Sequence, residues 1–100
     1  MCEMKYDKGV LTAVLSGEID HHAASDMRIT IDGQAQRFKP RTLELDFSKV
    51  SFMDSSGVGL VMGRYRNMQM LGGKLRVVNV PERHLKVFRL SGLAHLGIFK

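Results

Sequence analysis

Segments with the hydrophobic period of a β-strand alternate with segments of helical period along this chain, and their order limits the folds that it can adopt. Five segments have strand character: residues 2–7, 10–16, 43–47, 75–80 and 98–99. Three have apolar residues at spacings of three and four: from Asp20 or His21 to Phe38, from Asp54-Ser55 to about Leu71, and from Pro81 to Leu90. This alternation favours right-handed crossovers between parallel strands. The sequence predicts an α/β fold on a mixed, mostly parallel sheet of about five strands.

The strand segments also indicate which face of the sheet is covered. The turn residues Asp7-Lys8-Gly9 predict a hairpin between the first two strands. The second strand, Val10–Ser16, is nearly continuously apolar, as expected for a central strand that is covered on both faces or lies where the sheet is crowded. In residues 43–47, apolar side chains alternate with polar ones, which predicts one solvated face. The helices are therefore expected mainly on one face of the sheet.

Two of the predicted helices contain residues that oppose helix formation. The first includes the β-branched run Ile29-Thr30-Ile31 and the turn signal Asp32-Gly33. The second includes Gly57, Gly59 and Gly63, each of which costs roughly 0.5–1 kcal/mol relative to alanine inside a helix. Close approach of the helix backbone to the sheet or to a partner would offset that cost.

Length and composition indicate one soluble domain that spans residues 1–100. The single cysteine, Cys2, allows no internal disulfide and favours a reducing compartment. The longest apolar stretch, Val10–Leu15, is far shorter than the roughly 20 residues that cross a bilayer, and the N-terminus lacks the features of a signal peptide. A cytoplasmic location without a membrane partner is expected.

The formal net charge of +5 is concentrated in the second half of the chain. Residues 1–50 carry seven basic and eight acidic side chains, whereas residues 51–100 carry eight and two. The basic residues are scattered singly and form no run of like charge, which argues against direct nucleic-acid binding. These charges are expected to form a solvated basic face or a surface for an acidic protein partner.

Loops that leave parallel strands at their carboxyl ends meet at one edge of the sheet, where ligands and partners bind in such folds. Three loops are predicted to meet there: Gly17–His22, Ser51–Gly57 and Asn79–Glu82. Asp20, Asp54 and Ser55 are therefore candidates for one shared surface site. The alternative is that Asp54–Gly57 only caps the following helix, with a serine oxygen accepting the first backbone N–H groups.

The residue types near this edge argue against catalysis and against a metal or cofactor site. No GxSxG motif is present, and the adjacent His21 and His22 point in different directions on a helix, so neither is a clear base for a nucleophilic serine. The four histidines do not have the spacing of metal ligands. Gly57-Val58-Gly59 lacks the Lys-Ser/Thr of a phosphate-binding loop. Phosphorylation of Ser55 by another protein is the remaining chemistry.

Five stretches carry a resemblance to a known family, in register along the chain: GEIDHH at 17–22, FMDSSGVGL at 52–60, GRYRN at 63–67, GGKLRVVNV at 72–80 and RLSGL at 89–93. The chain resembles the STAS-domain family of bacterial anti-sigma-factor antagonists, most closely its sporulation branch, which acts on sigma F. The resemblance implies that the unmodified antagonist binds an anti-sigma factor that is also a serine kinase, with its bound nucleotide, and so releases the sigma factor for transcription. The kinase phosphorylates the first serine of the pair, here Ser55, and this ends binding until a serine phosphatase removes the phosphate.

The resemblance also assigns residues around the phosphorylation site. Asp20 corresponds to the family's acidic residue near the phosphoacceptor, and Asp54 immediately precedes the acceptor. The expected partner-binding residues near Ser55 are Asp20, His21, His22, Asp54, Ser56, Gly57 and Gly59. A phosphoserine at position 55 adds a charge of about −1.5 to −2. The helix N-terminus stabilises this negative charge, whereas the carboxylates of Asp20 and Asp54 repel it. The modification is therefore expected to block the contact surface and to leave the fold intact.

Two departures from the family pattern accompany this interpretation. The chain ends at Lys100, where relatives usually continue into a C-terminal helix, and its second half is unusually basic. The alternative function is a non-switching STAS interaction module of a sensory complex, which the absence of phosphate on Ser55 would favour. A small enzyme that uses Ser55 covalently is the third hypothesis, and turnover without a partner protein would identify it.

Overall fold

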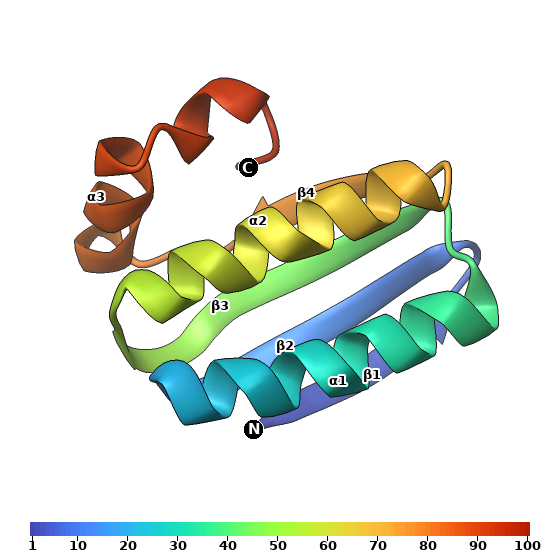
Figure 1. The fold of residues 1–100 in the computed structure, drawn as a ribbon, viewed down its shortest axis with the longest axis horizontal. Helices are drawn as coiled ribbons and strands as arrows, with labels where there is room; N and C mark the ends of the chain where they lie inside the picture. Colours follow the sequence, from blue (N-terminus) through green and yellow to red (C-terminus); the bar gives the residue numbers. More distant parts are fainter.

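Four strands form one sheet in the order β1-β2-β3-β4 (Figure 1). The computed structural model describes all of residues 1–100. The strands are β1 (Cys2–Asp7), β2 (Val10–Ile19), β3 (Thr42–Met53) and β4 (Lys74–Val78). β1 and β2 form the predicted antiparallel hairpin, while β3 pairs in parallel with both β2 and β4. The predicted mixed, mostly parallel sheet is confirmed.

Each of the three parallel strands is followed by a helix. The helices are α1 (His21–Phe38), α2 (Ser55–Met70) and α3 (Glu82–Leu90), and a 3-10 turn, η1 (Leu93–Leu96), follows the last. α1 and α2 lie side by side across one face of the sheet, whereas α3 and η1 lie beside the β4 edge (Figure 1). The prediction of helices mainly on one face is therefore confirmed.

The core fills the space between the sheet and the helices, and it contains 20 buried apolar residues. α1 contributes Met27, Ile31 and Ala35 to it. α3 joins through Phe88, whose ring meets Phe47 of β3 edge-on at a centroid distance of 5.5 Å. None of the helices combines the length and apolar composition that a bilayer-spanning helix requires.

The other face of the sheet is open and polar. On β2 only alternate residues are buried, all of them on the covered side: Leu11, Ala13, Leu15 and Ile19. A row of polar side chains in register crosses the open face from β1 to β4: Lys5, Thr12, Glu44 and Arg76. Within it, Arg76 Nε donates to Glu44 Oε2 over 2.7 Å. The apolar character of β2 thus reflects its crowded central position and not coverage of both faces.

α1 is continuous through Ile29–Gly33, the residues that were expected to disfavour a helix. Asp32, the first residue of the predicted turn signal, accepts hydrogen bonds from Arg64 and Asn67 of α2, at 3.1 and 3.2 Å. The neighbouring Ile31 is fully buried, while Gly33 is exposed. Contacts between the two helices and burial against the sheet therefore override the local preference for a turn.

The expected fifth strand at Ile98-Phe99 is reduced to one isolated parallel bridge between Val77 and Phe99. The left-handed Gly97, with φ +70°, ends η1 immediately before these residues, and one bridge is the extent of their pairing with β4. β4 is also shorter than the predicted 75–80, because Asn79 adopts a left-handed φ of +56°. The sheet therefore has four strands where about five were predicted.

Candidate functional site

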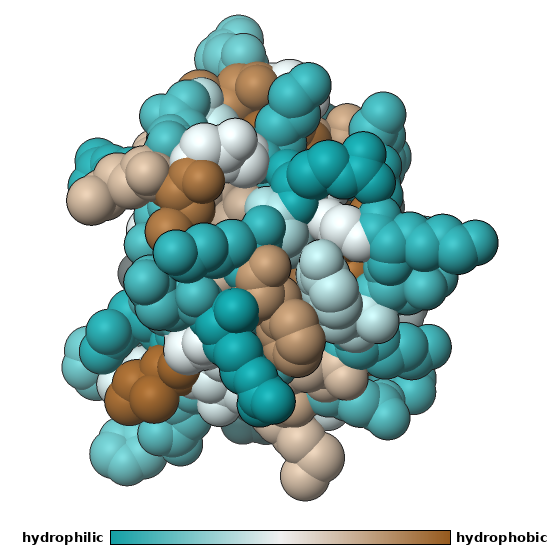
Figure 2. All heavy atoms as spheres, turned by 90° about the vertical axis from the view of Figure 1, so that its right-hand side faces the viewer, coloured by the Kyte–Doolittle hydropathy of each residue, from teal (hydrophilic) through white to brown (hydrophobic).

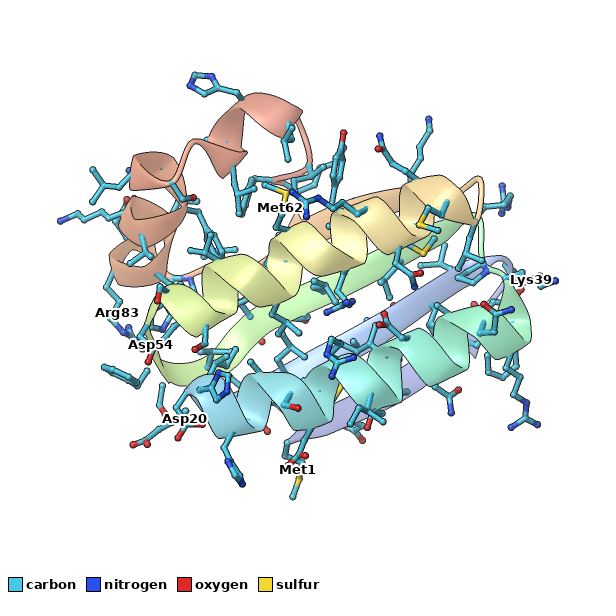
Figure 3. The ribbon with its side chains drawn as sticks, in the orientation of Figure 1. Met1, Asp20, Lys39, Asp54, Met62 and Arg83 are labelled. Atoms are coloured by element: carbon cyan, nitrogen blue, oxygen red, sulfur yellow. The ribbon has the colours of Figure 1, made fainter.

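The carboxyl ends of β2 and β3 place two aspartates side by side. Ile19 and Met53, the last residues of these strands, are register partners in the parallel pair. The next residues are Asp20 and Asp54, and both lie at the same end of the molecule (Figure 3). This is the edge at which the sequence predicted that the loops meet.

Both aspartates cap the helices that follow them. Asp20 Oδ1 accepts from the backbone N–H of Ala23 over 2.8 Å at the start of α1. Asp54 Oδ1 accepts from the N–H of Ser56 over 2.7 Å at the start of α2. Both carboxylates are thus held in place by the first turn of a helix, where the positive end of the helix dipole favours negative charge.

Ser55 is the first residue of α2, is exposed and makes no side-chain hydrogen bond within the chain. Asp54–Gly57 does cap α2 as the capping alternative expected, but through the Asp54 carboxylate; the expectation that a serine oxygen is the acceptor is wrong. Ser56 is half-buried and faces α1. An exposed, unbonded hydroxyl at a helix N-terminus is accessible to a modifying protein.

The glycines of α2 differ in their surroundings. Gly57 is buried, and a Cβ there would collide with Cγ and Sδ of Met53, the last residue of β3. This glycine therefore allows α2 to begin close to the sheet. Gly59 and Gly63 have no atom within 4 Å of the corresponding Cβ position, so close approach to the sheet does not explain them.

The histidines do not converge on one point. His21 and His22 are exposed in the first turn of α1. His84 of α3 is buried, 4% exposed, and its Nε2 lies 3.0 Å from the carbonyl oxygen of Val50. His95 lies in η1, and no group of three or more His, Cys, Asp or Glu residues could hold a metal ion.

Two side chains that the sequence did not single out lie near the aspartates. Phe52 is 51% exposed although it directly precedes the buried Met53. Arg83, from the start of α3, lies at the same end as Asp54 (Figure 3), and its Nη2 donates to the carbonyl oxygen of Val50 over 3.4 Å. β3 alternates between buried and less buried residues only as far as Phe47, so this pattern does not signal the exposure of Phe52. The position of Arg83 depends on how α3 packs, for which the sequence has no local signal.

A groove of about 340 Å³ runs between α1 and α2 and reaches the site through His21 and Ser56. Its lining residues are His21, Ala24, Ser25 and Arg28 from α1, and Ser56, Gly59, Leu60, Gly63 and Arg64 from α2. Arg64 is 5% exposed and pairs with Asp32, with Nε 2.7 Å from Oδ1. Burial lowers the pKa of the Arg64 guanidinium from its ordinary value, and Asp32 opposes this shift by favouring the charged form.

The opposite end of the molecule has a different surface. Figure 2 shows that end, where hydrophilic side chains cover most of the surface and hydrophobic ones form separate small groups. Lys39, the left-handed C-cap of α1, lies there (Figure 3). The two capping aspartates and the exposed serine therefore belong to one end only.

Residues 2–100 match the STAS domain family, and proteins named anti-sigma F factor antagonists match most of the chain. The chain belongs to the STAS family of anti-sigma factor antagonists. An anti-sigma F factor antagonist of Paenibacillus polymyxa is 37% identical over 91 residues, which cover 91% of this chain and 78% of the relative. One from Lysinibacillus sphaericus is 40% identical over 79 residues, which cover 79% of this chain and 68% of the relative. The resemblance found in the sequence is thus confirmed.

Solved structures agree with this assignment. The anti-sigma factor antagonist SpoIIAA in its unphosphorylated form superimposes with a TM-score of 0.87 at 33% identity, over 100% of this chain and 86% of that one. The phosphorylated form of Bacillus SpoIIAA superimposes with a TM-score of 0.79 over 100% of this chain and 89% of that one. In that relative, the STAS fold is present in both phosphorylation states.

Proposed function

We propose that this chain is an anti-sigma-factor antagonist that is switched by phosphorylation of Ser55. The unphosphorylated form binds an anti-sigma factor with serine kinase activity, together with its bound nucleotide, and so releases the sigma factor. The observation that carries this proposal is the exposed, unbonded Ser55 hydroxyl in the first turn of α2, beside two fixed carboxylates. The names of the relatives supply the class of partner.

The proposed contact surface follows from the exposure of the residues around Ser55. Asp20, His21, His22 and Asp54 are exposed, and Ser56 is half-buried. Phe52 adds an exposed aromatic ring, a residue type that is enriched at protein interfaces. Gly57 is buried beneath this surface, so it supports the interface by seating α2 and does not itself contact the partner.

The proposed switch acts through charge at this surface. A phosphate on Ser55 adds about −1.5 to −2 charges next to the carboxylates of Asp20 and Asp54. The N-terminus of α2 favours that charge, so the helix keeps its structure. The partner instead meets an additional, uncompensated negative group in the contact area. The presence of one fold in both forms of SpoIIAA supports a switch that acts on the surface.

In this proposal the chain acts by binding the anti-sigma factor. It is a substrate of the phosphorylation reaction and catalyses none itself. The anti-sigma factor phosphorylates Ser55, and a separate serine phosphatase restores the active form. No DNA or membrane contact is part of the mechanism.

The test is a phosphorylation assay with the anti-sigma factor of the same organism, ATP and Mg²⁺, followed by fragment mass spectrometry. We expect one phosphate, on Ser55. Ser55→Ala should abolish it and keep the affinity for the kinase, while Ser56→Ala, the matched control, should still be modified. Phosphate on Ser56, or unchanged modification of Ser55→Ala, would contradict the assignment. Binding of the kinase without any phosphate transfer would indicate the non-switching interaction module instead.

A further inference from the structure

Two glycines in the middle of α2 have no explanation within the chain. Glycine is unfavourable in a helix interior because its backbone loses more freedom on folding than that of alanine. Gly57 is accounted for by Met53, but Gly59 and Gly63 face open space, with nothing within 4 Å of a Cβ at either position. Both residues line the groove between α1 and α2.

The groove is also cationic. Its nine lining residues include two arginines, Arg28 and Arg64, and no acidic side chain. Arg64 is neutralised by Asp32, whereas Arg28 is exposed and makes no ion pair or hydrogen bond within the chain. Arg28 is close enough for its positive charge to contribute to the lowered pKa of Arg64. An unpaired positive charge therefore lies on a groove whose α2 wall has two positions without a side chain, Gly59 and Gly63, among Ser56, Leu60 and Arg64.

The dimensions of this wall suit a short peptide segment. Gly59 and Gly63 are four residues apart, which corresponds to about 6 Å along the helix axis. About two residues of extended chain cover that length. A backbone can approach a helix most closely where the helix carries no Cβ atoms.

We propose that this groove receives an acidic segment of the anti-sigma factor, an inference that rests on the proposed function. The segment lies with its backbone against Gly59 and Gly63, and one of its carboxylates pairs with Arg28. The groove opens beside Ser56, so a phosphate on the adjacent Ser55 repels the entering acidic segment. This contact would couple phosphorylation to the loss of binding.

The first test compares how Gly→Ala substitutions change the melting temperature of the chain and its affinity for the anti-sigma factor. Gly59→Ala and Gly63→Ala are compared with Gly33→Ala, a matched control inside α1 that is exposed, equally free of neighbours and outside the groove. All three should raise the melting temperature by about 2–6 °C, because alanine favours the helix. Only the two groove variants should raise the Kd for the purified anti-sigma factor of the same organism, by roughly ten-fold or more in calorimetry.

The second test concerns the charge of Arg28. Arg28→Glu is compared with Arg66→Glu, which makes the same change in net charge at an exposed residue of α2 that lies outside the groove. We expect Arg28→Glu to raise the Kd by roughly ten-fold or more and to reduce its dependence on salt, with a much smaller change for Arg66→Glu.

The outcomes distinguish this inference from the proposed function. If the wild-type chain binds the anti-sigma factor and the two groove glycine variants bind equally well, the groove is not the docking site. Equal effects of the two arginine variants would likewise overturn the inference, since they would show a response to net charge alone. If the wild-type chain does not bind at all, the proposed function fails and the docked segment fails with it.

Discussion

The N-terminal turns of α1 and α2 share a plan and differ in detail: the Asp20 carboxylate accepts from the third residue after it, whereas the Asp54 carboxylate accepts from the second. Each follows one of two paired strand ends, Ile19 and Met53, and each begins after a capping aspartate with a carboxylate-to-amide distance of 2.8 or 2.7 Å. After the cap, α1 continues with His21-His22-Ala23, whereas α2 continues with Ser55-Ser56-Gly57.

This difference shows how one type of helix start acquires a regulatory role. The hydroxyl at the first position of α2 supplies a phosphate acceptor that α1 lacks. The absence of a Cβ at the third position lets α2 begin directly against Met53, whereas Ala23 is accommodated at the same position of α1. The neighbouring helix start adds a second carboxylate beside the acceptor.

The largest expected effect tests whether only the α2 start is a switch. Ser55→Asp should weaken binding to the anti-sigma factor by about thirty- to one-thousand-fold, which corresponds to about 2–4 kcal/mol, because it places a negative charge in the contact surface. His22→Asp places the same charge in the first turn of α1 and should have a clearly smaller effect. Calorimetry measures both. Equal losses would mean that the two helix starts are equivalent for the partner, and an unchanged Kd for Ser55→Asp would exclude electrostatic blocking.

The second prediction concerns the third position of each helix. Gly57→Ala should lower the free energy of unfolding by about 1–3 kcal/mol, because the new methyl group overlaps the Met53 side chain. Ala23→Gly should lower it by only about 0.5–1 kcal/mol, the helix penalty of glycine. Denaturant unfolding measures both values.

The Met53→Ala background provides the control for this comparison. Removal of the overlapping side chain should make Gly57→Ala much less costly there than in the wild-type chain. The same cost in both backgrounds would show that Met53 is not the reason for the glycine.

Local signals made much of this arrangement predictable from the sequence. The two caps depend on single aspartates before apolar helical patterns, and the sheet edge follows from the order of elements. The continuity of α1 through Asp32-Gly33 depends instead on Arg64 and Asn67, which are 32 and 35 residues from Asp32. The groove likewise exists only where two helices meet, so no segment of the sequence indicates it. The periodicity of Ile98-Phe99 also does not reveal that these residues form one isolated bridge and no strand.

The third prediction tests the equivalence of the two caps. Asp20→Ala and Asp54→Ala should each lower the free energy of unfolding by about 1 kcal/mol, because each leaves one N–H of a helix N-terminus without its acceptor. Denaturant unfolding should show similar values for both. A loss at only one position would show that one of the two hydrogen bonds contributes little, and the helix starts would then differ in stability as well as in chemistry.

The smallest effect separates the charge of the caps from their hydrogen bonds. Asp20→Asn and Asp54→Asn keep an acceptor oxygen, so the free energy of unfolding should change by no more than a few tenths of a kcal/mol. Each removes a negative charge near the phosphate of phosphorylated Ser55. Since like charges disfavour the dianion, each carboxylate raises the second pKa of the phosphate, ordinarily about 6, and each substitution should lower it.

Phosphorus NMR titration of the phosphorylated chain measures this change. The decrease should be about 0.5, since a charge at about 4–6 Å in a watery environment contributes roughly 1 kcal/mol or less. It should be larger for Asp54→Asn, because Asp54 is the chain neighbour of Ser55, than for Asp20→Asn on the adjacent helix start. Asp7→Asn, which removes one carboxylate at the opposite end of the sheet, controls for overall charge and should leave the phosphate pKa unchanged. If neither asparagine variant alters it, the α1 start contributes no charge to the switch, and its likeness to the α2 start is structural only.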